Sequence, residues 1–574
     1  MTDDIITRGR ADLNAWETSK PDNFFRADAN LQYVLRRRLG DGAYAALAAD
    51  LTAFGAACAT TIDQAAKQED RLGNHPLLER FSATGNRSEQ IEFHPNHDLT
   101  GQIIWRTGIL AVLREPGHNV HQQALLYLLT QNGEAGHACS IACTAGLIRA
   151  LQTVGDDTVK AKFLPPLLDP DYATKQHGAQ FLTEVQGGSD VGANATVAVD
   201  QGDGAWRISG EKWFCSNIHA EQFLLTARPQ NAVAGTRGLG LFLVPRRLDD
   251  GATNGFFVRR LKDKLGTRTL PSAEVDFLDA VAYPVGAIDH GFKNVVELVL
   301  NTSRLMNAIS CAGIMRRAYL EAASFACVRQ AFGEPIASYP LAQEAVADIQ
   351  CETYAAVASG FALAALLDKI ETGQATADDR AVHRMFVNLN KYITAVRGTE
   401  AVHRAIEVLG GNGTIETFSI LPRLYRDMIV LESWEGTHNV LVLQVLRDIA
   451  KYRLHEALAR LVRAQLESVT HHQLLGDAVV VSAALDNVLD RLAGLEQKNS
   501  LYQQAHARRL ADLFTDVTQA ALLLGEAQWE LDQMLPTVKP EVVTHFVNRH
   551  LRPGYDPFND DTYLPRLNKL LLTF

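Results

Sequence analysis

The chain has 574 residues, of which 47% are hydrophobic and 21% charged, and its formal net charge is -11 with a sequence pI of about 5.9. A single hydrophobic core stops growing at about 250–300 residues, so we expect two to four domains. An acidic chain lacks the basic footprint typical of proteins that hold phosphate backbones, and nucleic acid is therefore not favoured as the main partner.

Residues 1–177 are predicted to form a helical N-terminal domain. Apolar residues recur there at three- and four-residue spacing, as expected for helices with one buried face. The predicted helices span 31–38, 44–67, 98–113 and 122–151, and Pro165, Pro166 and Pro170 close the region.

The pattern changes at about Gly178, and residues 178–290 are predicted to form a middle domain of short strands. Apolar and polar residues alternate between Gly, Pro and Asp positions, and Gly202-Asp203-Gly204 is a hairpin signal. Strands spaced this closely, without helices between them, favour an antiparallel sheet or barrel. The predicted strands lie within 196–208, 211–215, 223–227, 238–244, 256–261 and 273–278.

Helical periodicity returns at Phe292 and continues nearly to the end of the chain. Four segments have the lengths of a four-helix bundle, which we assign to a C-terminal domain at 291–450. Residues 451–574 are predicted to add a further helical domain, in which acidic and basic side chains nearly balance. That balance is unfavourable for a dedicated DNA-binding domain. The bundle segments are 294–328, 341–372, 377–409 and 440–466, and the added helices are 478–495, 501–535 and 542–548. The expected fold class is thus α+β multidomain, with a β-barrel between helical parts.

Seven cysteines are present, an odd number without a C-x-x-C pair, which matches neither a disulfide framework nor a zinc site. Cys139 and Cys143 lie one helical turn apart near His137, and we interpret them as packing residues rather than metal ligands. The first residues are acidic, and no apolar run reaches the ~18 residues needed to cross a bilayer. We therefore expect no metal, no membrane span, a reducing compartment and a cytoplasmic location.

The turn at residues 434–439 carries the strongest candidate for chemistry. Gly436 permits a bend that lets the preceding acid, Glu435, aim its carboxylate into a pocket. Glu435 is therefore the candidate base. The alternative is that Glu435 is an ordinary residue at a helix N-terminus, with Thr437 or Asn439 as the cap.

A glycine-rich loop at residues 182–190 precedes the strands of the middle domain. Its glycines bare backbone N–H groups, and its hydroxyls point from a tight loop, so it can cradle an anionic or polar cofactor. The spacing is not G-x-G-x-x-G and no βαβ unit is recognisable, so a Rossmann site is excluded. An ordinary glycine-rich turn is the alternative interpretation.

Five motifs, in this order along the chain, resemble those of the acyl-CoA dehydrogenase family. They are the loop 183–190, the strand 210–217, Arg329-x-x-Phe332-Gly333, Glu407-x-x-Gly410-Gly411-Asn412-Gly413 and Glu435-Gly436-Thr437. The resemblance covers about residues 90–450. Within the family the chain most resembles the AidB-type branch of alkylation-response flavoproteins. The features shared with that branch are the 183–190 loop, the runs 260–266 and 422–426, Trp434 before the glutamate and an extra C-terminal helical region.

The resemblance implies an FAD held between the barrel and the bundle. The loop with Leu182, Thr183 and Gly188 would meet the flavin ring and ribityl chain, and Ser189 would lie at the pyrophosphate and CoA side. Phe214 and Ser216 would flank the isoalloxazine ring, with Ser216 near N5. Arg329 and Phe332 would reach across a subunit interface to a neighbouring FAD, at a site completed by Gln343, Glu407, Gly410, Gly411, Thr437 and Asn439. FAD sites shared by two chains imply a homodimer, and family members are usually homotetramers.

The activity that the resemblance implies is dehydrogenation of an acyl-CoA thioester. Glu435 would take the α-proton as the β-hydrogen leaves as hydride to flavin N5, giving a trans-2-enoyl-CoA. Arg304 matches the family's basic residue near the pocket, and Ser189 and Gly436 would also contact the substrate. Glu432 is the competing carboxylate, but it has no glycine neighbour and matches no family acid. An electron-transfer flavoprotein would accept the electrons.

Four positions depart from the usual family pattern: Phe214 replaces Trp, Glu407 replaces Gln, Thr414 replaces an apolar residue and His438 replaces a small residue. The AidB-type branch is known for weak dehydrogenase activity and for DNA association through its C-terminal region. A DNA-protecting flavoprotein and a protein that sequesters acyl-CoA or fatty acids are therefore the alternative functions.

Overall fold

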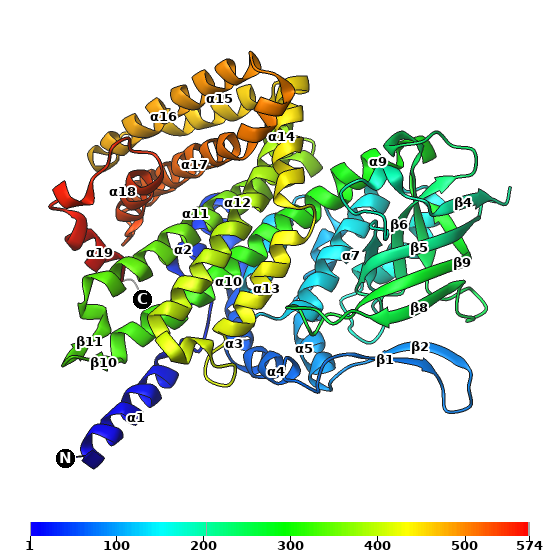
Figure 1. The fold of residues 1–574 in the computed structure, drawn as a ribbon, viewed down its shortest axis with the longest axis horizontal. Coiled ribbons are helices and arrows are strands. Elements are labelled where there is room, and N and C mark those ends of the chain that lie inside the picture. The colour runs from blue at the N-terminus through cyan, green and yellow to red at the C-terminus, as the bar shows by residue number, and fades with distance from the viewer. Residues whose placement is uncertain (1, 203, 572–574) are drawn as a thin grey trace.

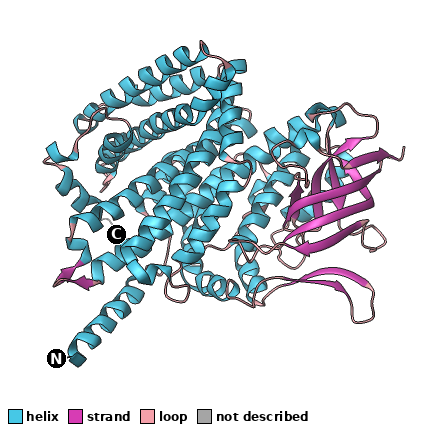
Figure 2. Cartoon of the chain, in the orientation of Figure 1, coloured by secondary structure: helices cyan, strands magenta, loops and turns pink. Residues whose placement is uncertain are grey.

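The structure is a computed structural model that describes residues 2–202 and 204–571. Asp203, part of the expected hairpin signal, lies outside those residues. Figure 1 shows a central set of long helices with the β part at one end and the C-terminal helices packed along the other side. The expected multidomain fold, with a β-barrel between helical parts, is confirmed, and Figure 2 shows most of the strands gathered in the barrel, with two small hairpins outside it.

The N-terminal part is mainly helical, but the sequence pattern missed its first helix and an exposed hairpin, β1–β2, that pairs Leu77 with Glu92. The expected helix 122–151 is divided, because Gly133 adopts a positive φ and the Glu134 side chain caps a new helix. The elements are α1 (Thr2–Ser19), α2 (Ala29–Leu39), α3 (Asp41–Ala57), a π-helical turn (Cys58–Ile62), α4 (Asp63–Glu69), β1 (Leu77–Phe81), β2 (Arg87–Glu92), α5 (Asn96–Trp105), α6 (Asn119–Thr130), α7 (Ala135–Val154) and α8 (Asp157–Phe163).

The middle part is a barrel closed by five strands in the order β6-β4-β5-β9-β7, with β7 pairing back to β6. Strand β3 adds to β6, and β8 adds to β9. Most pairings are antiparallel as expected, but β3 and β4 each run parallel to β6. Buried phenylalanines fill the interior. The strands are β3 (Gly178–Phe181), β4 (Val197–Asp200), β5 (Trp206–Ser216), β6 (Gln222–Pro229), β7 (Gly240–Pro245), β8 (Phe256–Leu261) and β9 (Ser272–Pro284).

The bundle that follows is built on three long helices, α10, α11 and α12, which pack against one another. Two helices, α13 and α14, pack against α12, and the turn between them holds Glu435. The sequence pattern showed α13 only as a short apolar run. The elements are α9 (Gly291–Asn294), a π-helical turn (Val295–Leu300), α10 (Asn301–Val328), β10 (Gln330–Ala331), β11 (Glu334–Pro335), α11 (Pro340–Glu371), α12 (Ala377–Leu409), α13 (Leu421–Ser433) and α14 (His438–Tyr452).

The last part packs on the bundle through α17, which contacts α11, α12 and α14. The expected helix 440–466 is broken at Arg453, whose positive φ of 51° separates α14 from α15. Arg397 of α12 donates to Gln519 of α17 over 2.9 Å, and Tyr392 of α12 donates to Asp512 over 2.7 Å. The helices are α15 (Leu454–Glu467), α16 (His472–Glu496), α17 (Ser500–Asp532), α18 (Lys539–His550) and α19 (Tyr563–Leu571).

Two helical segments of the described chain are long and apolar enough to span a membrane by length and composition. They are Asp41–Glu69 and Pro340–Glu371, and 28% and 67% of their most apolar windows are buried. The second segment is α11, which packs between α10 and α12 as a core helix of the bundle. Core helices commonly meet the same criterion, so it is weak evidence for a membrane span.

Candidate active site

Glu435 lies in a strained turn between two helices. Helix α13 ends at Ser433, and α14 begins at His438, so Glu435 belongs to neither helix. Its φ is 59° and that of Gly436 is 106°, both in the left-handed region. Glycine adopts that region freely, but for a glutamate it costs roughly 1–3 kcal/mol, and such strain persists only where surrounding contacts impose it. Thr437 stands at the N-cap position of α14 without a side-chain capping bond.

Two buried cations impose this turn by bonding its carbonyl oxygens. Arg304 Nε donates to the carbonyl oxygen of Glu435 over 3.1 Å. Lys391 Nζ donates to the carbonyl oxygens of Glu432 over 2.8 Å and of Gly436 over 3.2 Å. Charge-assisted bonds of this kind are roughly twice as strong as neutral ones. The carbonyls before, at and after Glu435 are therefore fixed from two different helices, α10 and α12.

The same cations set the electrostatics of the carboxyl group. Burial raises the pKa of Glu435 above its ordinary value, and the charges of Arg304 and Lys391 hold back part of that rise. Burial lowers the pKa of Lys391 to about 8 and that of Arg304 to about 10. No hydrogen bond to the Glu435 carboxylate occurs among residues 2–202 and 204–571. Glu435 is half-buried, and a partly desolvated carboxylate without a fixed partner is suited to accept a proton from a weak carbon acid.

Arg304 is held by three side-chain oxygens. Its Nη1 donates to Asn388 over 2.7 Å, to Asn301 over 3.2 Å and to Gln444 over 3.4 Å, and the residue is only 3% exposed. The π-helical turn at Val295–Leu300 comes immediately before this end of α10, and π-turns often occur at functional sites. These three acceptors are neutral and do not compensate the positive charge of Arg304. That charge therefore acts on the Glu435 carboxylate.

Glu432, the competing acid, is already engaged. Thr399 Oγ1 donates a short hydrogen bond to its carboxylate, and His438 Nε2 lies 3.8 Å from its other oxygen. The desolvated His438 ring has its pKa lowered to about 4. Glu432 therefore belongs to a surface network beside the turn, and Glu435 remains the better candidate base.

The barrel rim docks directly onto the helix that leads to Glu435. The backbone N–H of Thr267 donates to Asp427 of α13 over 2.5 Å. A Cβ on Gly266 would lie 2.3 Å from the carbonyl oxygen of Arg426, so only glycine allows this approach. Leu270 of the same loop packs with Cys139, Cys143 and partly buried Trp434. The run 260–266, chosen as a shared motif, thus places the barrel rim beside the Glu435 turn.

Helix α7 closes the other side of this region. The Sγ atoms of Cys139 and Cys143 are 3.9 Å apart, and that contact, burial and the nearby Glu435 charge all raise the pKa of Cys143. Gln180 of β3 donates to the Cys143 carbonyl over 3.0 Å and accepts from Ser303 of α10 over 3.3 Å. The interpretation as packing residues is consistent with this geometry. No group of three or more potential metal ligands is found in the described chain.

The glycine-rich loop is fixed beside strand β5. The N–H of Trp213 donates to the Thr183 carbonyl over 2.9 Å, and a Cβ on Gly188 would lie 2.9 Å from Thr183 Oγ1. Leu182 and Thr183 are half-buried, whereas Gly188 and Ser189 are exposed. Glu184 of the same motif is structural: it pairs with buried Lys212 at 2.7 Å. That ammonium outweighs the opposing effect of burial and lowers the pKa of Glu184.

Two side chains at the end of β5 point to the same rim. Phe214 is 56% exposed, although the next residue of the strand is buried inside the barrel. Ser216 is half-buried. Ser216 Oγ lies 2.8 Å from Ser272 Oγ across the β5–β9 pair. Because Ser272 follows the loop that packs on Trp434, the Ser216 hydroxyl lies on the side of the barrel that faces the Glu435 turn.

The remaining predicted cofactor residues lie elsewhere in the chain. Arg329 and Phe332 belong to the β10–β11 hairpin, far from the barrel in Figure 1. Phe332 is 98% exposed with φ of 54°, and Arg329 lies 3.8 Å from Asp12. Gln343 Nε2 donates to the Ala337 carbonyl over 2.8 Å in the same area. Within one chain this hairpin does not reach the barrel rim.

The other predicted cofactor residues lie in two groups, each at one end of a bundle helix. Glu407, Gly410 and Gly411 are exposed at the end of α12, and Glu407 lines a shallow groove there. Thr437 and Asn439 are exposed at the start of α14, where Arg508 of α17 donates to Asn439 over 2.9 Å. The C-terminal part therefore contacts the segment that follows the base.

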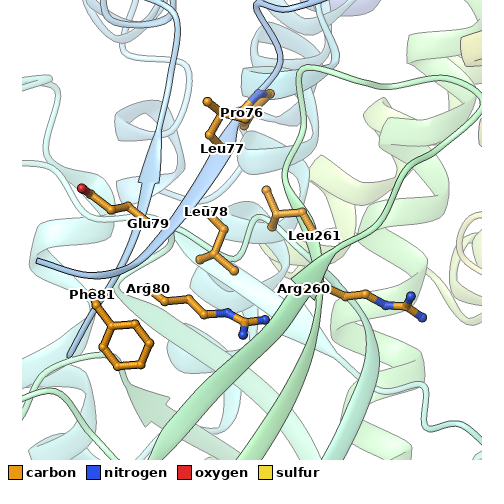
Figure 3. A pocket seen from close by; sticks show the side chains of 8 residues that line it. All are labelled: Pro76, Leu77, Leu78, Glu79, Arg80, Phe81, Arg260 and Leu261. Carbon is orange, nitrogen blue, oxygen red and sulfur yellow. The ribbon is translucent and has the colours of Figure 1, made fainter. Parts of the chain in front are cut away.

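Sequence reasoning missed Lys391 and Asn388. Each is a single polar residue in the long helix α12, and nothing in the local sequence distinguishes it from a surface position. The one indication in the sequence is their spacing. Asn388 and Lys391 are one helical turn apart, which places both on the same face of α12 as the apolar core residues. Figure 3 shows a further groove between the β1 strand and β8, lined by Pro76, Leu78, Arg80 and Arg260 among others, which does not include the base.

Three family models match consecutive parts of the chain. The AidB N-terminal domain of adaptive response proteins matches residues 14–174. The middle domain of acyl-CoA dehydrogenases matches residues 179–280, and their C-terminal domain matches residues 289–450. Together the three matches cover most of the first 450 residues.

Full-length relatives agree. The chain is 31% identical over 438 residues to acyl-CoA dehydrogenase family member 11 of Caenorhabditis elegans, covering 74% of this chain and 70% of the relative. It is 31% identical over 468 residues to the putative acyl-CoA dehydrogenase AidB of Escherichia coli K12, covering 79% of each chain.

Solved structures show the same architecture. The apo form of Bd2924 is 30% identical with a TM-score of 0.81, covering 88% of this chain and 98% of that one. The Caenorhabditis elegans protein ACDH-11, solved in complex with C11-CoA, is 28% identical with a TM-score of 0.86, covering 92% of each chain.

Proposed function

The chain belongs to the acyl-CoA dehydrogenase family, and we propose that it is an FAD-dependent acyl-CoA dehydrogenase that forms a trans-2,3 double bond in an acyl-CoA thioester. The observation that carries the proposal is the Glu435 turn. Its half-buried carboxyl group accepts no hydrogen bond from the described residues, and its backbone is held at positive φ by Arg304 and Lys391. Strain maintained by buried cations around one acid is characteristic of a functional site.

The residues at the barrel rim fit a flavin. An exposed aromatic ring, Phe214, stands beside the Ser216 hydroxyl, and the Thr183 loop closes on the same strand with a glycine where a Cβ would collide. Leu182, Thr183, Gly188, Phe214 and Ser216 would hold the flavin end of FAD. Bound there, FAD supplies the hydride acceptor for the substrate β-carbon.

Glu435 takes the α-proton in this proposal. The carboxylate must be deprotonated to do so, which the positive charges of Arg304 and Lys391 favour against burial. The backbone N–H of Glu435 makes no hydrogen bond within the described parts of the chain, so it is available to the thioester oxygen, on which negative charge develops. Gly436 keeps that approach open, and Ser189, which is exposed, would contact the CoA part of the substrate.

The hairpin with Arg329 and Phe332 supports a site shared by two copies. An aromatic side chain that is 98% exposed at a strained hairpin tip is expected to be covered by something, and a guanidinium beside it suits a bidentate contact with pyrophosphate. Gln343, Glu407, Gly410, Gly411, Thr437 and Asn439 would complete the partner's FAD site. We therefore propose a homodimer, which a homotetramer would contain twice.

A DNA-protecting flavoprotein is the second candidate, favoured by the AidB N-terminal domain and the AidB relative. The structure gives this candidate little electrostatic support. In the C-terminal part, Arg453 pairs with Glu456 at 2.6 Å, Arg460 with Asp378 at 2.7 Å and Arg552 with Asp477 at 2.6 Å. Neutralised arginines release few counterions on binding duplex.

The test is the purified protein's response to substrate. A dehydrogenase retains FAD, and its flavin absorbance bleaches without oxygen when a suitable acyl-CoA from a panel of chain lengths is added. An electron-transfer flavoprotein then restores the absorbance. A protein that retains FAD, bleaches with no acyl-CoA and binds duplex with a steep salt dependence would instead establish the second candidate. Co-purified lipid without turnover would establish sequestration.

A further inference from the structure

A partly buried hydrogen-bond chain runs from Lys264 through Ser272 to Ser216. Lys264 Nζ lies 3.1 Å from Ser272 Oγ, and Ser272 Oγ lies 2.8 Å from Ser216 Oγ. Lys264 is in the loop that docks on α13, Ser272 begins β9 and Ser216 ends β5, so three segments of the barrel rim meet in this chain. None of the five family motifs that pointed to the site explains Lys264 or Ser272.

All three N–H groups of the Lys264 ammonium have acceptors. They are the Leu270 carbonyl at 2.8 Å, the Thr267 carbonyl and hydroxyl at 2.8 and 3.0 Å, and the Ser272 hydroxyl. The Thr267 hydroxyl donates its own proton to the Gly266 carbonyl oxygen over 2.7 Å. An ammonium has donors and no acceptor, so the Ser272 oxygen must accept from Lys264.

The direction of the next bond follows from counting protons. Ser272 is 3% exposed, and the only polar side-chain neighbours of its hydroxyl among the described residues are Lys264 and Ser216. If Ser216 donated to Ser272, the Ser272 proton would be buried without an acceptor, which costs about 1–3 kcal/mol. If Ser272 donates to Ser216, the Lys264 and Ser272 donors of the chain both have acceptors. The Ser216 proton is then free to point outward from the rim.

We propose that Lys264 is a positioning residue that, through Ser272, fixes the Ser216 hydroxyl as a hydrogen-bond donor toward the flavin. This inference rests on the proposed function, since it assigns a direction to a group that would face the FAD. A donor aimed at the N5 side stabilises the electron-rich reduced ring more than the oxidised ring. Lys264 and Ser272 touch neither cofactor nor substrate and act only through Ser216.

The test uses the FAD-loaded protein and measures the midpoint potential of the flavin by spectroelectrochemical titration. Lys264→Met and Ser272→Ala are each expected to move the potential in the negative direction, as does Ser216→Ala. The double variant Lys264→Met with Ser272→Ala should move it no further than the larger single shift, because both changes break one chain. Lys264→Arg keeps a group that only donates hydrogen bonds, so its flavin midpoint potential should stay close to that of the native protein.

Ser272→Ala separates the effect of the Ser216 hydrogen-bond direction from the effect of the Lys264 charge, because it leaves the ammonium in place. A wild-type potential in Ser272→Ala at full FAD content would overturn the proposal even if Lys264→Met failed to fold. Lys262→Met removes a neighbouring ammonium that pairs with Glu274 at 2.8 Å, lies over the Trp213 and Phe214 rings and makes no hydrogen bond to the Ser272 hydroxyl among the described residues. An equal shift in that variant would show that charge alone is responsible and would also overturn the proposal.

The proposed function and the positioning role of Lys264 can be contradicted separately. A protein that takes up no FAD overturns both the proposed function and the positioning role. A protein that holds FAD but bleaches with no acyl-CoA overturns the dehydrogenase activity, while the predicted order of midpoint potentials still tests the hydrogen-bond chain.

Discussion

Lys391→Met removes the ammonium that bonds the carbonyls on both sides of Glu435, and we predict that the turn then loses its fixed conformation. In the native protein three charge-assisted bonds hold the turn: two from Lys391, at 2.8 and 3.2 Å, and one from Arg304 at 3.1 Å. At about 1.5–3 kcal/mol each, these sum to roughly 4.5–9 kcal/mol. They oppose roughly 1–3 kcal/mol of strain in the positive-φ glutamate.

Without Lys391, one bond of about 1.5–3 kcal/mol opposes strain of nearly the same size. With the two nearly balanced, about half of the molecules keep the competent turn, and a further loss of about 1.4 kcal/mol would lower that ratio tenfold, so we expect kcat to fall by about two- to tenfold. The pKa of Glu435 should also rise further, because the Lys391 charge opposes the effect of burial. A base works only when deprotonated, so the acid limb of the pH–rate profile should move to higher pH.

The assay is the rate of anaerobic flavin bleaching by one acyl-CoA, measured across pH at equal FAD content. Lys391→Arg is the matched control, since it keeps a buried positive donor and should retain an acid limb near that of the native protein. Native rates and an unmoved acid limb in Lys391→Met would refute the reasoning about the turn.

Three further predictions concern other contacts. Arg304→Lys keeps a charge but cannot span three acceptors and the turn carbonyl, so kcat should fall about tenfold in steady-state assays. Gly266→Ala places a Cβ 2.3 Å from the Arg426 carbonyl oxygen and should destabilise the fold by about 1–3 kcal/mol in denaturant titrations. Gly476→Ala, with open space around its Cβ in α16, should not destabilise it. Phe332→Ala should weaken FAD retention and self-association in ultracentrifugation, without lowering the stability of a single chain; unchanged association would contradict the shared site.

The candidate base could be predicted because its signal is local. An acid followed by glycine between two helical patterns indicates a turn, and the structure places Glu435 in one. Lys391 could not be predicted, because its role depends on α12 lying at the centre of the bundle, with the turn packed over it. In the sequence it is one lysine in a helix of 33 residues.

The fold shows the same division between local and non-local information. The long helices α11, α12 and α17 and the strands β7 and β8 were predicted close to their observed bounds, whereas the expected helices 122–151 and 440–466 are each divided. The β1–β2 hairpin was missed because its strands are short and mostly exposed, so they carry no alternation of buried and exposed residues. The parallel pairing of β3 and β4 with β6 was missed because strand direction depends on where distant segments return to the sheet.

Gly266 shows how a motif can be noticed before its reason is known. The sequence marks the run 260–266 only as a shared pattern. The structure gives the physical cause, because the glycine lets the barrel loop meet the backbone of α13 and lets Thr267 bond Asp427. The same loop contains Lys264, which this contact holds at the barrel rim.

The most direct measurement compares anaerobic flavin bleaching in Glu435→Gln and Glu432→Gln at equal FAD content. Removal of a general base lowers a rate by roughly 10²–10⁴-fold, so Glu435→Gln should keep its yellow colour and bleach at least ~100-fold more slowly with the best acyl-CoA. Glu432→Gln, an equal loss of charge three residues earlier, should bleach at close to the native rate. Rapid bleaching in Glu435→Gln, or its loss only in Glu432→Gln, would contradict the assignment of the base.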